Sequence, residues 1–363
     1  MDNLFTIVLI HLIICKYRRF TLYLFPILTM QKVNYFIPRI LILLVFSVII
    51  SVIYQYFLYP KTLQTEGWLK TVGEKTYLKK PDIIYFSASP NAAYFEGDFD
   101  KRSIAQKIQS YLKVDKIEAM DTGAIHAGIF LHALKQMPTE YKPKLIVMDL
   151  NLRSFGNMWI QSGLENSLQR NIVYWNKYPG IINRIRASLK NYSYIPYHER
   201  SELIQYDEKF KKLPFKDSCQ TIKKWTDSIR NKTNFDPIGT EMVIHFGFLI
   251  DKNNQMLLEY DKIVNYCKLK QIPIILLILP ENLDGMSLKA GENLKKLCLQ
   301  NVTFLQKHFS KTNAKVINDV DLLDSSYFFE DFPTEHYKSD GREQVAKSVA
   351  RQFNTKFIKT KNL

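Results

Sequence analysis

Hydrophobic and polar positions follow two alternating patterns along most of the chain. Five short apolar runs, rich in β-branched residues, predict buried strands at 82–86, 116–120, 144–150, 273–279 and 314–317. Five longer stretches with apolar residues at helical spacing alternate with them, at 103–112, 125–137, 255–270, 291–309 and 339–353. Strands that alternate with helices form right-handed βαβ units around a parallel sheet. We therefore expect an α/β domain over 80–363, with helices on both faces of the sheet.

Five such strands predict a flavodoxin-like, three-layer α/β/α fold with a five-stranded, mostly parallel sheet. Ligands of such folds bind beyond the carboxyl ends of the strands. The alternation is interrupted at about 157–240 by an aromatic and basic stretch that is too long for an ordinary loop. We interpret it as a mostly helical insertion. Its residues Trp159, Tyr174 and Trp175 fit a sugar-binding groove or, as the favoured interpretation, the core between packed helices.

One apolar run is of a different kind. Residues 37–59 read IPRILILLVFSVIISVIYQYFLY, with Arg39 as the sole charge, and this is long enough to cross a bilayer. Three tyrosines stand near its far end, as in the aromatic belt of membrane helices, and basic residues gather before it. The pattern predicts a single-pass signal anchor at 37–59 in the cytoplasmic (inner) membrane, preceded by a cytoplasmic segment at 1–36. A polar linker at 60–79 would then lead to an extracytoplasmic or periplasmic domain.

The first 29 residues allow two interpretations. Their apolar run LFTIVLIHLIIC is too short to span a bilayer, and KYRR follows it. Met30 begins a segment that has the pattern of a complete signal anchor by itself, so translation can start there and leave 1–29 as an upstream extension. In the other interpretation this run is a second hydrophobic element at the membrane interface.

Composition narrows the classes of function. The formal net charge is +15, but the lysines and arginines are scattered, which suits an anionic glycan or lipid surface. No nucleic-acid-binding signature is present, so we expect no nucleic-acid partner. The cysteines show no CxxC spacing, and we expect neither a disulfide framework nor a metal site, and no cofactor. They are Cys15, Cys219, Cys267 and Cys298.

Polar residues cluster where predicted strands end. IIYFSASPN stands at the end of the first strand, AMDTGAIHAG at the end of the second and LIVMDLNLRSFG at the end of the third, while FFEDFPTEHYKSDGREQVA precedes the final helix. The carboxyl ends of parallel strands meet at one edge of a sheet, so these blocks should lie together. A serine hydroxyl becomes a good nucleophile when a histidine removes its proton, and a carboxylate can orient that histidine.

Taken together, the four blocks resemble the SGNH/GDSL hydrolase superfamily. The resemblance is strongest to its membrane-anchored envelope branch, which includes the D-alanine-transfer and polysaccharide O-acetyl transfer proteins, and it covers the chain from about residue 80 to 353. It implies that Ser89 is the nucleophile and His336 the catalytic base. It also implies an oxyanion hole formed by Asn151 and by the backbone N–H of Gly123.

Two blocks depart from the family pattern. Ala88 stands where the family has Asp before the nucleophile, and Ser87 takes the place of a glycine. The family places the acid three residues before the histidine, where this chain has Pro333; Asp331 is the candidate acid, with a longer loop between it and His336. If Asp331 does not serve, the histidine works as a dyad with the serine or is oriented by a carbonyl group.

Other polar residues near this edge have less defined roles. His126 and Gly128 are alternatives to Gly123 as the oxyanion donor, and His126 is also a candidate substrate contact. Arg153 can bind a substrate anion or form a salt bridge to Asp149 or Glu165. For Glu281, in ILLILPEN, a strand-end loop is the default interpretation.

The sequence thus predicts a membrane-anchored SGNH-like serine esterase or acyltransferase that acts on O-acyl groups of cell-envelope glycans. A membrane-bound acyltransferase is an expected partner if acyl groups are transferred. The alternative is a non-catalytic SGNH-fold protein that binds glycan or scaffolds an envelope assembly.

Overall fold

The computed structural model describes residues 30–112, 116–121, 123, 125–156, 163–189, 237–330 and 334–353. The chain divides into two compact units. One consists of Met1–Pro60 with Pro179–Ile181, and the other of Lys61–Tyr178 with Ile182–Leu363. The second unit holds the sheet and all the residues of the candidate site.

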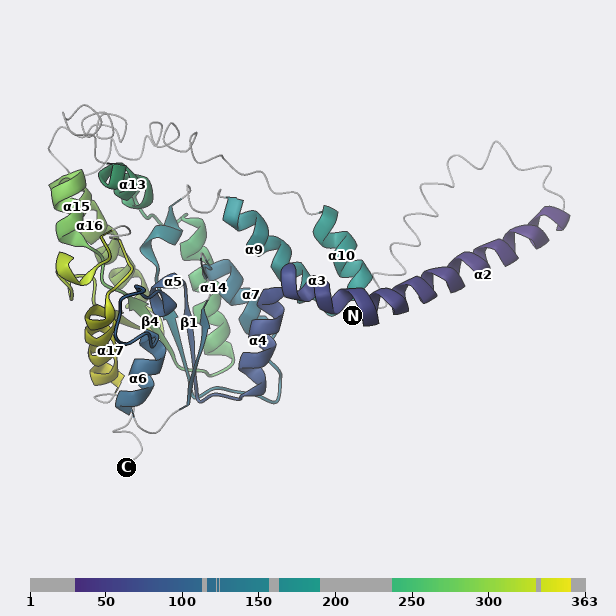
Figure 1. Cartoon of the computed structure of the whole chain (residues 1–363), viewed down its shortest axis with the longest axis horizontal. Helices are drawn as coiled ribbons and strands as arrows, with labels where there is room; N and C mark the ends of the chain where they lie inside the picture. Colours follow the sequence, from purple (N-terminus) through teal and green to yellow (C-terminus); the bar gives the residue numbers. More distant parts are fainter. Residues whose placement is uncertain are drawn as a thin grey trace. The chain divides into compact units, whose positions relative to one another are not determined.

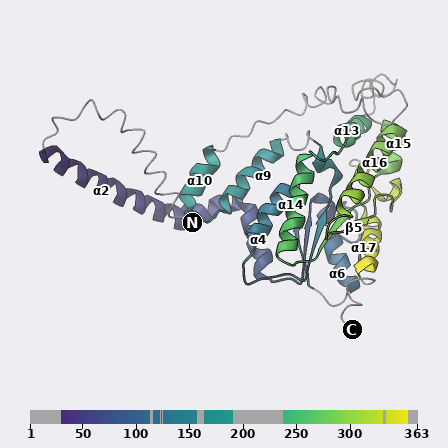
Figure 2. The same cartoon turned by 180° about the vertical axis from the view of Figure 1, so that it is seen from behind.

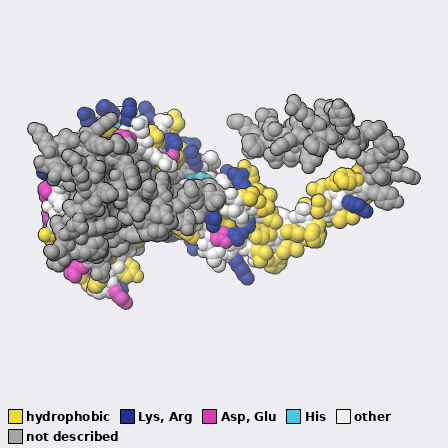
Figure 3. Space-filling model, turned by 90° about the horizontal axis from the view of Figure 1, so that it is seen from above, with side chains coloured by type: hydrophobic (Ala, Val, Ile, Leu, Met, Phe, Trp, Pro, Cys, Tyr) yellow, Lys and Arg dark blue, Asp and Glu magenta, His cyan; other side chains and the backbone are white. Residues whose placement is uncertain are grey.

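An apolar helix fills most of the described part of the first unit. Helix α2 (Met30–Ile53) continues through the π-helical turn η1 (Tyr54–Leu58) into α3 (Tyr59–Thr65). Within it, the 30 residues Phe36–Thr65 have a mean hydropathy of 2.7 in their most apolar window, none of which is buried. Figure 3 shows hydrophobic side chains along its length. The helix is therefore long and apolar enough to cross a membrane, as the sequence predicted.

The second unit is built on a five-stranded parallel sheet in the order β2-β1-β3-β4-β5 (Figure 1). Its strands are β1 (Ile83–Ser87), β2 (Ile117–Asp121), β3 (Leu145–Asp149), β4 (Ile274–Ile278) and β5 (Lys315–Asn318). Ile83 pairs with Ile117 on one side and with Leu145 on the other. The predicted α/β fold with a five-stranded parallel sheet is confirmed.

Helices cover both faces of this sheet (Figures 1 and 2). Alternate residues of a strand point to opposite faces, so Ile84 and Phe86 of β1 belong to one hydrophobic cluster, while Ile83 and Tyr85 belong to the other. The first cluster includes residues of α7 (Ala127–Lys135), α14 (Gln255–Leu269) and α16 (Glu292–Phe309). The second includes residues of α6 (Ile104–Leu112) and α17 (Ser339–Phe353). Burial on both faces explains why the three central strands, β1, β3 and β4, are nearly continuous apolar runs, whereas the edge strands β2 and β5 are mixed.

The stretch predicted as a polar linker, 60–79, contains a helix of the domain instead. Helix α4 (Trp68–Leu78) buries Leu69 and Tyr77 in the first cluster. The Tyr77 hydroxyl donates a hydrogen bond to the carbonyl oxygen of Ala133, with 2.6 Å between the oxygen atoms. The sequence did not reveal this helix, because charged residues surround a narrow buried face. That face is formed by Leu69, Val72, Thr76 and Tyr77.

The predicted insertion at 157–240 contains helices where the structure describes it. These are α9 (Gly163–Tyr174), α10 (Gly180–Leu189) and α13 (Pro237–Phe246), whereas 157–162 and 190–236 lie outside the described residues, Trp159 and Glu165's side chain among them. Tyr174 and Trp175 are buried, which supports a packing role rather than a sugar groove. The remaining short elements are α5 (Ser89–Ala92), η2 (Leu152–Phe155), α15 (Leu283–Ala290) and η5 (Ser325–Tyr327).

Candidate active site

The carboxyl edge of the sheet gathers residues from distant parts of the chain. Ser89 follows β1, Gly123 follows β2, and Asn151 follows β3, while His336 precedes α17. Since all five strands are parallel, these strand ends lie at one edge.

Ser89 and His336 are in direct contact at this edge. The Nε2 atom of His336 lies 3.0 Å from the Oγ atom of Ser89, and both side chains are half-buried. This distance allows the imidazole to accept the hydroxyl proton. The pair is separated by nearly the whole domain in sequence, so the fold alone brings it together.

The short helix α5 presents Ser89 at its first position. Ala88 before it is extended, with φ of −91° and ψ of −158°, and Pro90 behind it has a fixed φ that suits a helix start. Asn91 is fully buried and anchors the turn: its Nδ2 donates to the Asp121 carboxylate, and its Oδ1 accepts from the Ala105 backbone N–H at 2.8 Å. The turn that carries the serine is thus tied to both β2 and α6.

Ser87 has a different environment from Ser89. It is fully buried, and its Oγ donates a hydrogen bond to the Asp149 carboxylate. The Tyr85 hydroxyl donates to the same carboxylate at 3.1 Å. Burial raises the pKa of Asp149 to about 7, although the hydrogen bonds from Ser87 and Tyr85 oppose this shift. Ser87 therefore has a structural role at the end of β1, and Ser89 is the serine that is accessible to a ligand.

Burial also affects the histidine. It lowers the pKa of His336 below its ordinary value of 6.5; the nearby charge of Glu335 opposes this shift and that of Arg153 adds to it. The ring of Phe329 lies 6.0 Å from the imidazole, centroid to centroid. His336 is consequently neutral at neutral pH, which is the form that can act as a base.

The carboxylate residues Asp331 and Glu335 stand shortly before the histidine in the chain. Asp331 lies outside the described residues. Glu335, which adjoins His336, is buried against Arg153, whose Nη1 lies 2.9 Å from one carboxylate oxygen and 3.0 Å from the other. The Thr334 hydroxyl donates to the same carboxylate. Glu335 is thus engaged by a buried cation and a hydroxyl.

The two candidate oxyanion donors, Asn151 and Gly123, lie in different local environments. The Oδ1 of Asn151 accepts the backbone N–H of Arg153 at 3.1 Å and so caps η2, which leaves its Nδ2 as the end of the amide available to a ligand. Gly123 lies exposed in the turn after β2, with open space around its Cα.

The two candidate substrate contacts are used inside the fold. His126 is buried, and its Nδ1 accepts the Gly128 backbone N–H at 3.2 Å, so it caps α7. Arg153 is buried in its ion pair with Glu335. The sequence did not predict Glu335 as a partner of Arg153, and the side chain of Glu165, one of the predicted partners, lies outside the described residues.

Two further polar residues, both noted in the sequence, are buried beneath this edge. Glu281 follows β4 and is buried; burial, then the charge of Glu335, raise its pKa well above the ordinary value, while Arg153 opposes the shift. The neighbouring Asn282 accepts hydrogen bonds from the Gly285 backbone N–H at 2.8 Å and the Ser325 hydroxyl at 2.6 Å. Both act within the strand-end loop, the default interpretation from the sequence.

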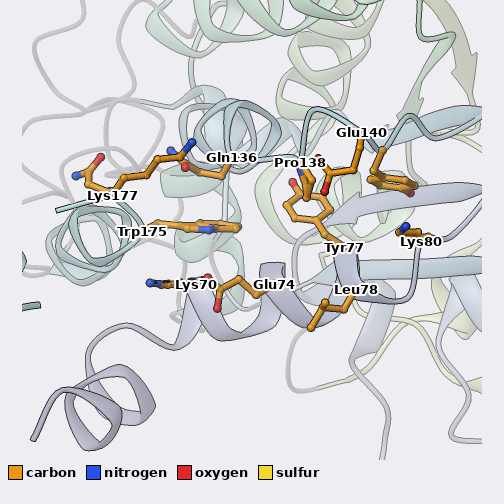
Figure 4. A pocket seen from close by; sticks show the side chains of 12 residues that line it. Lys70, Glu74, Tyr77, Leu78, Lys80, Gln136, Pro138, Glu140, Trp175 and Lys177 are labelled. Atoms are coloured by element: carbon orange, nitrogen blue, oxygen red, sulfur yellow. Dashed lines mark ion pairs between the residues drawn. The ribbon is translucent and has the colours of Figure 1, made fainter. Parts of the chain in front are cut away.

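A separate cavity of about 440 Å³ lies at the opposite end of the strands. Lys80, just before β1, and Pro138, in the loop before β3, both line it. Figure 4 shows Tyr77 and Trp175 as its apolar wall, with Glu74 beside them. Strands of five residues, about 17 Å long, separate that end of the sheet from Ser89.

Within the described part of the chain, no three His, Cys, Asp or Glu side chains form a group that could hold a metal ion. Cys267 and Cys298 are buried free thiols. The chemistry that the edge can perform from its described residues is nucleophilic: a serine hydroxyl, a neutral imidazole base, and hydrogen-bond donors at neighbouring strand ends.

Fold and edge together define a three-layer α/β protein with a serine–histidine pair at the carboxyl edge of a 2-1-3-4-5 sheet. No protein-family model matches the chain, and no curated protein is similar to it in sequence.

Solved structures of GDSL proteins are similar to it in structure. A GDSL-like lipase from Bacteroides thetaiotaomicron matches with a TM-score of 0.35 and 9% identity. The match covers 79% of this chain and 97% of the lipase chain. A protein from Desulfitobacterium hafniense, described as lipolytic and of the G-D-S-L family, matches with a TM-score of 0.36 and 9% identity over 74% and 98%. A protein from Bacteroides fragilis described as an acylhydrolase matches with a TM-score of 0.34 and 11% identity over 75% and 86%. All three matches have TM-scores below 0.5 and identities of 11% or less. At such scores they do not define a function, which has to come from the side chains of this chain.

Proposed function

We propose that this protein is a serine esterase or acyltransferase of SGNH type that acts on O-acyl groups of cell-envelope glycans. The observation that carries the proposal is the 3.0 Å contact between Ser89 Oγ and His336 Nε2 at the carboxyl edge of the sheet.

The reaction proceeds through an acyl-enzyme. His336 removes the hydroxyl proton as Ser89 Oγ attacks the ester carbonyl carbon, and the carbonyl oxygen becomes an oxyanion. The backbone N–H groups of Ser89 and Gly123 and the amide of Asn151 stabilise that charge. Protonated His336 then gives its proton to the leaving sugar oxygen. In the second half, water or an acceptor hydroxyl attacks the acyl-enzyme, and Asp331 orients the imidazole throughout.

The membrane setting is part of the proposal. The exposed apolar helix Phe36–Thr65 is suited to anchor the chain in the cytoplasmic membrane as a single pass. The basic residues before it favour a cytoplasmic N-terminus and a domain outside. A tethered domain meets substrates held at the membrane surface, and a membrane-bound acyltransferase is the natural acyl donor if the acyl group is transferred.

A fluorophosphonate probe tests the proposal, because it reacts covalently with an activated serine. We expect the full chain in detergent to be labelled at Ser89, and Ser89→Ala and His336→Ala to lose the label. Ser87→Ala, the matched control, should keep it. Labelling of Ser89→Ala at Ser87 would contradict the assignment of the nucleophile. A folded wild-type protein that is neither labelled nor active on any ester would favour the alternative, a non-catalytic glycan-binding protein.

A further inference from the structure

The loop that joins α5 to α6 exposes three aromatic side chains. Tyr94 is 52% exposed, Phe95 56% and Phe99 84%. The loop begins directly after the short helix that presents Ser89. Large apolar side chains are usually buried, and a group of them on the surface marks a place where something binds.

This loop is held rigidly by one buried arginine. Arg342 of α17 is fully buried, and its guanidinium donates to the carbonyl oxygens of Ala93 at 3.1 Å and Asp100 at 2.6 Å. It also forms an ion pair with Asp98 at 2.9 Å. The same guanidinium donates to the carbonyl oxygen of Tyr337 at 2.8 Å, the residue after the histidine. One side chain therefore fixes both the aromatic loop and the loop that carries His336.

Asp98 adds further restraints. Its carboxylate accepts the backbone N–H of Phe95 at 2.9 Å and that of Ser339 at 3.0 Å. The Nζ atom of Lys101 lies 5.2 Å from the centre of the Tyr94 ring. The rings are thus presented to solvent from an ordered backbone, and a ligand that binds them pays little conformational entropy to order them.

A line of rings connects the loop to the reacting pair. The centroids of Phe95 and Phe329 are 6.0 Å apart, and those of Phe329 and His336 are also 6.0 Å apart. We use the term aromatic platform for Tyr94, Phe95, Phe99 and Phe329. Phe329 and Phe95 lead from the imidazole to the exposed loop that also carries Tyr94 and Phe99, and the part of a substrate beyond its ester group would lie there.

The exposure of these rings indicates the chemistry of the ligand. An acyl chain is bound best in a concave, mostly apolar pocket that encloses it. The aromatic platform is instead open to water and is flanked by charged side chains such as Glu96 and Lys101. Such a surface suits a ligand with one apolar face and a polar rim. A pyranose ring has this form: its C–H groups can contact the negative face of an aromatic ring while its hydroxyl groups stay hydrated.

We propose that the aromatic platform binds sugar rings of a glycan chain next to the esterified residue and so selects polymeric over small esters. This inference rests on the proposed function for the reaction at Ser89, but the binding itself needs no catalysis.

The binding arm of the test uses the full chain with Ser89→Ala, which cannot turn over its ligand. Calorimetric titration with chitohexaose, cellohexaose and mannohexaose, each with and without O-acetyl groups, should show binding of at least one hexamer. Adding Phe95→Ala and Phe99→Ala should weaken that binding about tenfold or more, since each ring contact is worth roughly a threefold to tenfold change. Leu269→Ala, which removes an exposed apolar side chain at the end of α14, is the matched control and should have no effect.

The kinetic arm separates a sugar from an acyl chain. For an active wild type, the ratio of kcat/KM on the O-acetylated hexamer to that on 4-nitrophenyl acetate should fall about tenfold in the double variant, through KM. Phe95→Trp should preserve the ratio and Phe95→Leu should lose it, because a sugar face needs a ring while an acyl chain accepts leucine. Preserved function in Phe95→Leu, with altered preference between acetyl and octanoyl esters, would overturn the proposal in favour of an acyl site.

The two arms also distinguish failure of the platform from failure of the proposed function. An active esterase whose Ser89→Ala form binds none of the hexamers overturns the platform alone. Ring-dependent binding by a protein without esterase activity keeps the platform and overturns the reaction. Melting temperatures of all variants show whether any loss is one of folding.

Discussion

Two serines two positions apart have separate tasks in this protein. Ser87 is the last residue of β1 and is bonded to the buried Asp149 carboxylate, whereas Ser89 begins α5 and touches His336. The difference follows from strand geometry: Ser87 lies within the last pairing of β1 with β2, and the chain turns before Ser89. A substitution at each position should therefore have a different kind of effect.

Ser89→Ala should abolish hydrolysis of 4-nitrophenyl acetate, on the order of 10⁴- to 10⁶-fold in kcat, because nucleophile and base act as a unit. His336→Ala should be nearly as damaging, and the double variant little worse than either. Steady-state kinetics of the three variants at equal melting temperature checks this. Losses that multiply in the double variant would show that the two side chains act independently.

Ser87→Ala should instead lower stability. The variant removes a donor from a buried carboxylate and should cost about 1–3 kcal/mol of unfolding free energy. Denaturant unfolding measures the cost. An unchanged midpoint would mean that Tyr85 and the Ala88 backbone N–H satisfy Asp149 without the hydroxyl.

Asp149 should make stability depend on pH. Its pKa is about 7 in the folded state against an ordinary value of 3.8, so between these pH values the folded chain holds a proton that the unfolded chain has lost. The contribution of Asp149 to stability is therefore present in full at low pH and falls by about 4 kcal/mol as pH rises from about 4 to 7. Asp149→Asn should flatten the unfolding free energy over this range. Parallel wild-type and variant curves would contradict the assignment.

The protonation of His336 should determine how kcat/KM falls at acidic pH. Because burial lowers its pKa, the imidazole remains neutral at mildly acidic pH, and kcat/KM should begin to fall only below the ordinary histidine value of 6.5. A pH–rate profile on a small ester measures this fall. An apparent pKa above 6.5 would mean that a carboxylate dominates the surroundings of the histidine.

At the scale of elements, the sequence predicted the strands and the long helices well, but it did not predict the short helix α5 or helix α4 with its narrow apolar face. All five strands were located, and the three central ones most directly, because burial on both faces makes them nearly continuous apolar runs, as in IILLI of β4. Helix α5 was missed because four residues carry no helical period, and its anchor, Asn91, gives no signal apart from following Pro90. The order of Ser89, Asn151 and His336 along the chain was predictable, whereas the partner of Arg153 depends on a side-chain direction that no pattern encodes.

Helix α4 offers a test of its own place in the core. A Cβ atom at Gly73 would lie 1.9 Å from the Trp175 ring, so Gly73→Ala should displace the indole and cost about 1–3 kcal/mol of stability. Lys75→Ala, on the exposed side of the same helix, is the control and should change little. Thermal unfolding of both variants measures this difference in stability. Equal stability would show that α4 is loosely attached, like the linker predicted for this stretch.

At the scale of the whole molecule, the proposed topology rests on the apolar helix and on the charge asymmetry around it. A C-terminal alkaline phosphatase fusion should be active in cells, since that enzyme needs an oxidising compartment, and a cytoplasmic reporter at the same position should be silent. The opposite pattern would place the domain in the cytoplasm and remove envelope glycans as substrates.

The guanidinium of Arg342 has a consequence for the timing of biosynthesis. Ser89 leaves the ribosome early, but the histidine that activates it and the arginine that braces its neighbouring loop are both among the last parts of the fold to be made. If the chain is exported as proposed, a nascent copy crossing the membrane carries an inert hydroxyl until α17 docks on the sheet. The proposed reactivity toward esters then arises in a single late step, and unfinished or truncated copies do not cleave acyl groups on the way to their destination.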